Sequence, residues 1–253
     1  MPDGRGAKFG PVRTIPAPTD ERINGPMATP ASSIQLPNSP PPRGLKITEI
    51  FTSVQGESSL VGWPTVFVRL TGCPLRCRWC DTPYSFQGGD WMEIDAIVER
   101  VLAAGVGHVC VTGGEPLSQK RCIELLRALC NADLTVSLET SGAVSIADVD
   151  PRVIKVMDLK APGSHEVERN DWSNLALLQP HDQIKIVIAD RVDFEWAVAQ
   201  VRDRELGRWQ ILFSPVWGEL QPKTLAEWIL AERAPVRLRL QTHKYLWGEA
   251  PGR

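Results

Sequence analysis

The sequence lacks the features of a membrane-spanning, secreted or nucleic-acid-binding protein. No apolar run approaches the roughly 20 residues that a transmembrane helix needs, and the amino terminus has no apolar stretch typical of secretory signals. An excess of charge of one sign is also lacking, because 28 basic and 30 acidic residues are mixed along the chain and give a net charge of −2. Non-specific binding of DNA or RNA needs a basic surface. We therefore expect a cytoplasmic protein that does not contact a membrane or nucleic acid directly.

Cysteine is scarce, and half of it is concentrated in one short run. Of six cysteines, Cys73, Cys77 and Cys80 form a C-x3-C-x2-C triplet that follows a strand-like segment. Three thiolates on one tight loop can each bind one iron of a cubane cluster, which leaves the fourth iron open to a small molecule. Structural zinc usually needs a second cysteine pair, which does not accompany the triplet, so zinc is the weaker alternative. The spacing is typical of radical S-adenosylmethionine (SAM) enzymes.

The other three cysteines suit a structural role. Cys110 lies in a strand-like run, and Cys122 and Cys130 lie in a helix-like run. A free cysteine commonly behaves as a small buried hydrophobic residue. We therefore expect these three in the core, in the reduced state that a cytoplasmic protein favours.

Composition divides the chain into a tail and one domain. Residues 1–43 are rich in Pro, Gly, Ser and Thr and show almost no apolar periodicity. Such a segment cannot bury enough surface to offset its ordering entropy, so the sequence predicts a disordered tail over 1–43. The remaining residues, 44–253, are enough for about one domain of roughly 200 residues.

Within residues 44–253, short apolar runs alternate with amphipathic runs. This alternation is typical of βα units around a parallel sheet. About seven strands are fewer than the eightfold fold requires, and the sequence therefore predicts an α/β protein with an incomplete (β/α) barrel of the radical SAM type. The predicted strands are residues 65–70, 108–112, 134–139, 153–158, 183–189, 209–214 and 236–241. The predicted helices are residues 94–104, 118–130, 192–201 and 224–231.

Polar and glycine-rich segments follow five of the predicted strands. They are the cysteine loop and the segments at residues 112–116, 139–142, 158–160 and 241–244. The carboxyl ends of parallel strands share one edge, where barrel-like α/β folds assemble their sites. We therefore expect all five segments to surround one cavity.

The Gly-Gly-Glu-Pro run at residues 113–116 connects a buried-looking strand to a helix. Its two glycines let the backbone approach a ligand closely, although alone they would indicate no more than a turn. Together with the triplet, the run resembles the segment that binds the methionyl amino group of SAM in the radical SAM superfamily. Four further elements narrow this resemblance to the 7-carboxy-7-deazaguanine synthase family over about residues 46–247. They are Q-G-E at 55–57, F-V-R-L at 67–70, W-C-D-T at 79–82 and Q-T-H-K at 241–244.

The resemblance implies a role for individual residues. The cysteines of the triplet would hold a [4Fe-4S] cluster, and Thr82 would bind magnesium. The positions implied for S-adenosyl-L-methionine are Trp79, Cys80, Asp81, Gly114, Asp158, Leu159 and Lys160. The positions implied for the substrate are Val54, Gln55, Gly56, Arg69 and Thr112.

The chemistry of the residues supports some of these roles and adds three candidates. A guanidinium such as that of Arg69 pairs well with a carboxylate, although a salt-bridged strand arginine is the alternative. Glu57 and Glu139 could accept hydrogen bonds from the guanidine-like edge of a pterin, or serve as surface or capping groups. His243 is either a hydrogen-bonded structural residue or a donor to the substrate. Thr82 suits magnesium only if the substrate carboxylate completes the coordination sphere.

The reaction implied by the resemblance is a radical lyase reaction. It converts 6-carboxy-5,6,7,8-tetrahydropterin to 7-carboxy-7-deazaguanine with loss of ammonia, in 7-deazapurine (queuosine) biosynthesis. The expected partners are the small pterin substrate, an electron donor such as flavodoxin or ferredoxin, and a second copy in a homodimer. Two other functions remain as alternatives: a glycyl-radical activating enzyme, which shares the cysteine and Gly-Gly-Glu-Pro motifs, and a zinc-stabilised binding module without catalysis. The sequence departs from the family pattern in two places. Residues 245–253 continue beyond the Q-T-H-K element, and the loop between Thr82 and Trp91 is short.

Overall fold

The computed structural model describes residues 44–248, 250 and 252, and these form one α/β domain around a nine-stranded sheet. The strand order is β3-β1-β2-β4-β5-β6-β7-β8-β9. The tail predicted over residues 1–43 lies outside the described residues. The strands are β1 (Gly44–Val54), β2 (Pro64–Leu70), β3 (Asp90–Glu93), β4 (His108–Gly113), β5 (Thr135–Thr140), β6 (Ile154–Leu159), β7 (Gln183–Ile188), β8 (Gln210–Pro215) and β9 (Arg237–Leu238).

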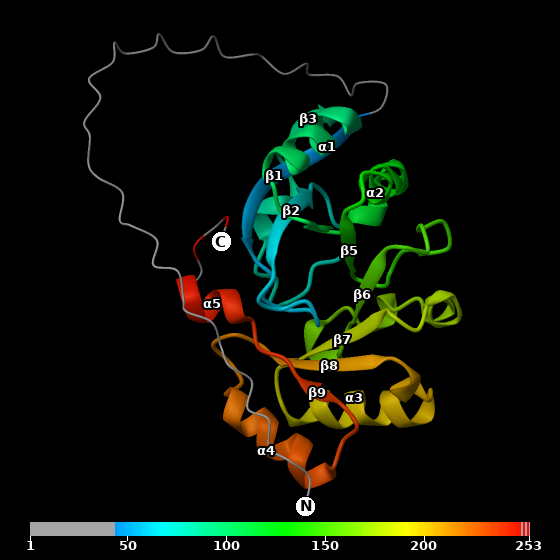
Figure 1. Ribbon diagram of the computed structural model, residues 1–253. Coiled ribbons are helices and arrows are strands. Elements are labelled where there is room, and N and C mark those ends of the chain that lie inside the picture. Colours follow the sequence, from blue (N-terminus) through cyan, green and yellow to red (C-terminus); the bar gives the residue numbers. More distant parts are fainter. Residues whose placement is uncertain (1–43, 249, 251, 253) are drawn as a thin grey trace, which may run out of the picture. The chain divides into compact units, whose positions relative to one another are not determined.

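The sheet curves without closing, as an incomplete barrel does. From β2 through β9 every neighbouring pair is parallel, whereas β1 runs antiparallel to both β2 and β3. Among the described residues, β3 and β9 stand at the two ends of the strand order and do not pair with each other. Figure 1 shows the resulting arc, from β3 and β1 at one end to β8 and β9 at the other. The predicted fold class is confirmed.

The strands show where the sequence prediction was accurate and where it was not. The first six predicted strands agree with β2, β4, β5, β6, β7 and β8 to within one residue at either end. The last prediction was too long, because β9 pairs with β8 only over Arg237–Leu238. Two strands, β1 and β3, were not predicted. They form the antiparallel edge of the sheet, where β1 pairs with β2, for example Thr52 with Val66 and Val54 with Pro64.

Five α-helices accompany the sheet: α1 (Ile94–Ala103), α2 (Cys122–Asn131), α3 (Arg191–Asp203), α4 (Pro222–Glu232) and α5 (Thr242–Trp247). The helix predicted over residues 118–130 begins later, at Cys122, because Pro116–Ser118 forms a separate 3-10 turn. The side chain of Glu115 caps that turn by accepting a hydrogen bond from the backbone N–H of Leu117. The short helix α5 was not predicted. In the described part of the chain, no helix has the length and apolar character needed to cross a bilayer.

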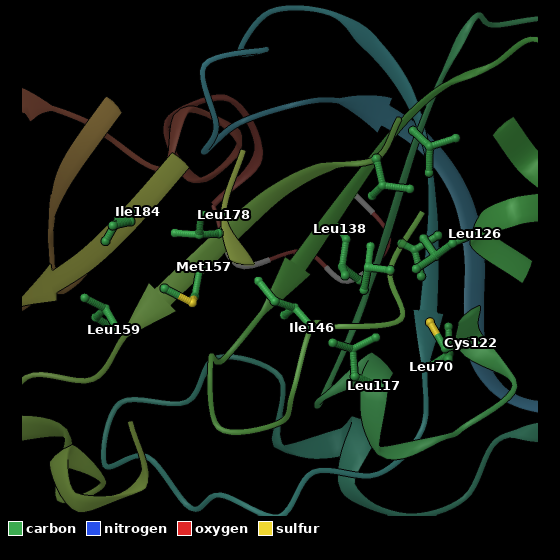
Figure 2. Close-up of a cluster of buried hydrophobic side chains, with 14 of the residues drawn as sticks. Leu70, Leu117, Cys122, Leu126, Leu138, Ile146, Met157, Leu159, Leu178 and Ile184 are labelled. Atoms are coloured by element: carbon green, nitrogen blue, oxygen red, sulfur yellow. The ribbon is translucent and has the colours of Figure 1, made fainter. Parts of the chain in front are cut away.

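The hydrophobic core fills the space between the sheet and the helices. Figure 2 shows Leu70 and Leu138 from the strands, and Leu126 and Cys122 from α2, within one cluster of buried side chains. Cys110 and Cys122 are fully buried and Cys130 is 7% exposed, which confirms the structural role predicted for these three cysteines. Figure 1 shows α5 and α2 on opposite sides of the sheet.

Candidate active site

A cavity of about 620 Å³ lies at the carboxyl ends of the parallel strands. All five polar segments that follow predicted strands contribute to its lining, so the convergence expected from the sequence is observed. The cavity brings together all but one of the predicted site residues. They are Val54, Gln55, Gly56, Glu57, Arg69, Cys73, Cys77, Trp79, Cys80, Asp81, Thr82, Thr112, Gly114, Glu139, Asp158, Lys160 and His243.

Leu159 is the predicted site residue that does not line the cavity. Its side chain is 1% exposed and belongs to the hydrophobic core, on the face of β6 opposite Asp158. Successive side chains of a strand alternate between faces, so Asp158 and Lys160 point to the cavity and Leu159 points away. The cofactor contact predicted for Leu159 stays a prediction.

The three triplet cysteines line the cavity and are partly exposed. Burial raises the pKa of Cys77 to about 11, against the lowering effect of Lys160, so this group is a neutral thiol when no metal is bound. Among the described residues, no three thiol, imidazole or carboxylate groups converge on a single point as ligands of one ion would. A cubane cluster does not need such convergence, because each thiolate binds a different iron.

The glycines of the Gly-Gly-Glu-Pro run fit closely against the cysteine loop. A Cβ on Gly114 would lie 2.6 Å from the Cβ of Cys73 and would also overlap the carbonyl oxygen of Gly72. A Cβ on Gly113 would lie 2.5 Å from the carbonyl oxygen of Leu70. Only glycine leaves room for the two segments to approach each other here. The three available thiols and this bare backbone beside them fit a cluster with SAM on its open iron.

Glu115 of the same run has a structural position. It is fully buried, and its carboxylate accepts hydrogen bonds from Thr140 Oγ1 at 3.0 Å, Ser141 N–H at 2.7 Å and Ser141 Oγ at 2.6 Å. These contacts join the end of β4 to the end of β5. They fix the glycine turn relative to the neighbouring strand, and a buried charge with this many donors is well satisfied.

Arg69 lies on β2, lines the same cavity and is held by a carboxylate. Its Nε donates to Glu49 Oε1 at 2.7 Å, and the Tyr84 hydroxyl donates to the same oxygen at 2.9 Å. Arg69 is therefore a salt-bridged strand residue, as one of the two alternatives predicted, and it also lines the cavity. Its contact with a substrate carboxylate stays a prediction. Although burial alone would lower its pKa, Tyr84 and Glu49 raise the pKa of Arg69. The sequence analysis missed Glu49 and Tyr84.

Two carboxylates, Glu57 and Glu139, also line the cavity. Glu139 accepts hydrogen bonds from Thr112 Oγ1 at 3.2 Å and from Gln55 Nε2 at 3.5 Å. Burial raises its pKa, and the nearby Glu57 raises it further. Burial acts in the same direction on the pKa of Glu57, but Lys185, His243 and Gln241 outweigh it and hold that pKa well below the usual range. Neither carboxylate is a surface charge or a helix cap.

Lys185 is the most prominent site residue that the sequence analysis missed. Its Nζ lies 2.7 Å from Glu57 Oε2 and 3.2 Å from Asp158 Oδ2, while Lys160 Nζ lies 3.1 Å from the other oxygen of Asp158. A signal was present in the sequence. Lys185 interrupts the apolar run of β7, and a lysine in a buried parallel strand requires a partner.

The Q-T-H-K element covers one side of the cavity and is attached at several points. Gln241 Nε2 donates to Glu57 Oε1 at 2.8 Å and to Asp81 Oδ2 at 3.3 Å, and Lys244 Nζ pairs with Asp81 at 3.2 Å. His243 Nε2 lies 3.9 Å from Glu57 Oε1. The last element of the domain thus connects the Q-G-E segment to the W-C-D-T segment.

Thr82 offers one hydroxyl to a magnesium ion. Its Oγ1 lies 3.9 Å from Cys80 Sγ, beside the cavity. The neighbouring carboxylate, Asp81, is already engaged by Lys244 and Gln241. Magnesium prefers carboxylates and water, so Thr82 fits as one ligand of a sphere that a substrate carboxylate would complete.

The sequence and the fold were compared with those of known proteins. Residues 67–158 match the Radical SAM superfamily. A 7-carboxy-7-deazaguanine synthase of Chlorobaculum tepidum is 49% identical over 207 residues, which cover 80% of this chain and 94% of the relative. One from Koribacter versatilis is 43% identical over 80% of this chain and 97% of the relative. The crystal structure of QueE from Escherichia coli superposes with a TM-score of 0.63 at 23% identity, over 78% of this chain and 94% of that chain.

These relatives are similar along nearly the whole of their own length, and the residues that match the Radical SAM superfamily hold the cysteine triplet and the Gly-Gly-Glu-Pro run. The relatives do not favour the glycyl-radical activating enzyme or the zinc-stabilised module. The fold of the QueE structure agrees with the incomplete barrel observed here. The chain therefore belongs to the 7-carboxy-7-deazaguanine synthase family, within the radical SAM superfamily.

Proposed function

We propose that this protein converts 6-carboxy-5,6,7,8-tetrahydropterin to 7-carboxy-7-deazaguanine with loss of ammonia, as a radical SAM carbon–nitrogen lyase of 7-deazapurine (queuosine) biosynthesis. The observation that carries the proposal is one cavity lined both by three free thiols and by an arginine whose guanidinium suits a carboxylate. Family membership supports the same reaction.

The cofactors are a [4Fe-4S] cluster and SAM. Cys73, Cys77 and Cys80 would hold the cluster, and the open backbone at Gly114 would receive the methionyl end of SAM. Asp158 and Lys160, which pair at 3.1 Å and line the same cavity, would be partners for polar groups of the cofactor. When bound, the two cofactors supply the one-electron chemistry that removes a hydrogen atom from C6 of the pterin. The chain's own residues hold the reacting groups in place and keep water out.

The residues proposed for the substrate suit a pterin acid. The Arg69 guanidinium is fixed through its Nε by Glu49, which sets the plane in which it can meet a substrate carboxylate. Glu57 and Glu139 are acceptors for the N–H groups of the guanidine-like edge. Thr82, together with the substrate carboxylate, would bind the magnesium ion.

The remaining assignments follow from the chemistry and the family resemblance. Cluster chemistry needs a one-electron donor, for which flavodoxin or ferredoxin is proposed. The proposed assembly is a homodimer, and the proposed location is the cytoplasm, where thiols stay reduced.

The decisive experiment is anaerobic turnover with the carboxytetrahydropterin, SAM and a chemical reductant, followed by mass analysis. We expect 7-carboxy-7-deazaguanine and ammonia as products. Cys77→Ala should lose most of its iron and all cofactor cleavage, because a cluster ligand is removed. The matched control is Cys122→Ala, which alters a fully buried core cysteine and should keep both. Absence of product from a fully iron-loaded wild-type protein would refute the proposal, and full iron content in Cys77→Ala would refute the cluster assignment.

A further inference from the structure

Lys185 is a buried lysine for which neither the motifs nor the family resemblance provides a role. It lies on β7 next to β6, in register with Asp158 in the parallel ladder, and its side chain is 12% exposed. Its ammonium group contacts Glu57 on one side and Asp158 on the other. Glu57 comes from the Q-G-E segment proposed for substrate binding, and Asp158 from the strand end proposed for the cofactor.

These contacts form a continuous line of charge across the cavity. Lys160 and Lys185 take the two oxygens of Asp158, and Lys185 and Gln241 take the two oxygens of Glu57. Lys185 is the member shared by both carboxylates. A single side chain therefore joins the part of the site facing the cysteines to the part facing the pterin.

The electrostatic environment explains why a cation is needed at this point. Glu57 and Glu139 are both buried and repel each other, and burial opposes the charged form of each. Removing one partner of a buried pair leaves a charge that takes up a proton rather than remain uncompensated. A protonated Glu57 would lose acceptor capacity for the N–H groups of a pterin.

We propose that Lys185 is a positioning residue for both ends of the site, which keeps Glu57 as an ionised acceptor aimed at the substrate and holds Asp158 in place at the cofactor. This inference rests on the proposed function. It adds Lys185, which contacts no reacting atom but keeps Glu57 ionised and sets the orientation of Asp158.

Several charged and titratable groups face Glu57 from the elements packed around it. Lys185 comes from β7, Glu139 from β5, His243 from α5 and Arg239 from the segment after β9. His243 is the imidazole among these groups, with its Nε2 3.9 Å from Glu57 Oε1. His243 is present in the wild type and in the Lys185 variants alike. The effect of Lys185 is therefore the difference between the variant and the wild type in how Kd depends on pH.

The test uses iron-loaded protein under anaerobic conditions and four variants. Lys185→Met removes the charge with a similar length of chain, and Lys185→Arg keeps the charge. Lys155→Met is the matched control. Lys155 is also a buried lysine, 3% exposed and 3.0 Å from Asp182, but it lies at the amino-terminal end of β6, away from the cavity.

Calorimetry measures the Kd of the carboxytetrahydropterin and of SAM between pH 6 and pH 8. Infrared pH-difference spectra report protonation of a carboxyl group, with Glu57→Gln to assign the band.

We expect Lys185→Met to bind the pterin about tenfold or more weakly at pH 6 than the wild type does, and to recover as pH rises, because each pH unit changes the ionised fraction of Glu57 up to tenfold. SAM affinity should also fall, since Asp158 loses one of its two ammonium partners. Between pH 6 and pH 8, the spectra of Lys185→Met should show a protonated-carboxyl band that the wild-type spectra lack. Adding Glu57→Gln to Lys185→Met should remove this band. Lys185→Arg should retain the wild-type profile, and Lys155→Met should lower thermal stability without altering either Kd profile.

Two results would overturn the inference. One is a Lys185→Met profile that parallels the wild type for both ligands, and the other is the absence of the Glu57 carboxyl band from its spectra. The infrared measurement needs no substrate. If the wild type failed to bind or turn over the pterin, the proposed function would fall while the role of Lys185 at Glu57 would still be decided.

Discussion

At the scale of single residues, the cavity is defined by buried charges that each have a named partner. Arg69 has Glu49, and Lys185 has Glu57 and Asp158. Paired in this way, charged groups can remain in a partly dry cavity without the full cost of desolvation. Their geometry is therefore set before a ligand arrives.

The substitution Arg69→Lys tests the carboxylate contact. Lysine keeps the charge but loses both the planar two-point contact and the Nε that Glu49 holds. Pterin binding should weaken by roughly 1.5 to 3 kcal/mol, the range for a hydrogen bond to a charged group. SAM cleavage without substrate, measured as 5′-deoxyadenosine, should persist. Arg152→Lys is the control, because Arg152 forms a comparable two-point contact with Asp150, 2.9 Å and 2.8 Å long, outside the cavity. Unchanged pterin affinity in Arg69→Lys would contradict the carboxylate contact.

Most residues of the site could be predicted from the sequence, but their pairing could not. The cysteines, Gly114, Arg69 and Glu57 belong to short motifs whose spacing is visible in the chain. Lys185 and Glu49 are separated by 128 and 20 positions from the residues that they hold, and only the folded chain brings each pair together. A lysine in a buried strand indicates that a partner exists without indicating which one.

At the scale of elements, the parallel strands were the most predictable part. Their apolar runs are short, continuous and bounded by glycine-rich turns, as expected for strands covered on both faces. β1 was missed because it is only partly buried over most of its length and contains the polar residues Lys46, Thr48 and Glu49. α5 has six residues, too few for a periodic pattern. The position of α5 depends instead on contacts with the Q-G-E segment.

The close contact between Gly56 and α5 gives a prediction at this scale. The backbone N–H of Thr242 donates to the carbonyl of Gly56 at 3.1 Å, and a Cβ on Gly56 would overlap the ring of His243. Gly56→Ala should therefore displace the Q-T-H-K element and reduce turnover at least about tenfold, since small misplacements in a reacting geometry are costly. Steady-state kinetics would measure this. Gly107→Ala is the control, because a Cβ at Gly107 meets nothing within 4 Å. Equal activity of the two variants would show that the contact is dispensable.

At the scale of the whole molecule, the domain has a second polar region at the amino-terminal ends of its strands. His108 Nδ1 lies 2.7 Å from Thr65 Oγ1, and its Nε2 lies 3.0 Å from Ser137 Oγ, so one imidazole joins β2, β4 and β5. The residue is 1% exposed. Burial lowers the pKa of His108 to about 4, from the usual 6.5.

This lowered pKa predicts how stability depends on pH. The fold favours neutral His108, so its contribution is fully present above pH 6.5 and is lost as pH falls from 6.5 toward 4. Between pH 7 and pH 5.5 the loss should be about 1 kcal/mol. His108→Gln should be less stable at pH 7, and its deficit relative to the wild type should shrink by that amount at pH 5.5. Anaerobic denaturant unfolding of both iron-loaded proteins measures the difference, in which the cluster contribution cancels. A deficit independent of pH would show that the imidazole titrates normally.

The hydrogen bond from Gln241 to Glu57 connects the end of the domain to its beginning, and this has a consequence for the synthesis of the enzyme. During synthesis, the cysteine loop, the glycine turn and Asp158 leave the ribosome well before Gln241, and Glu57 waits for that partner until almost the end of translation. Domains generally fold as units as they emerge. All residues proposed for the cofactors are thus synthesised before the last residues that line the pterin site. A chain interrupted before residue 241 would carry all three iron ligands but an incomplete substrate site.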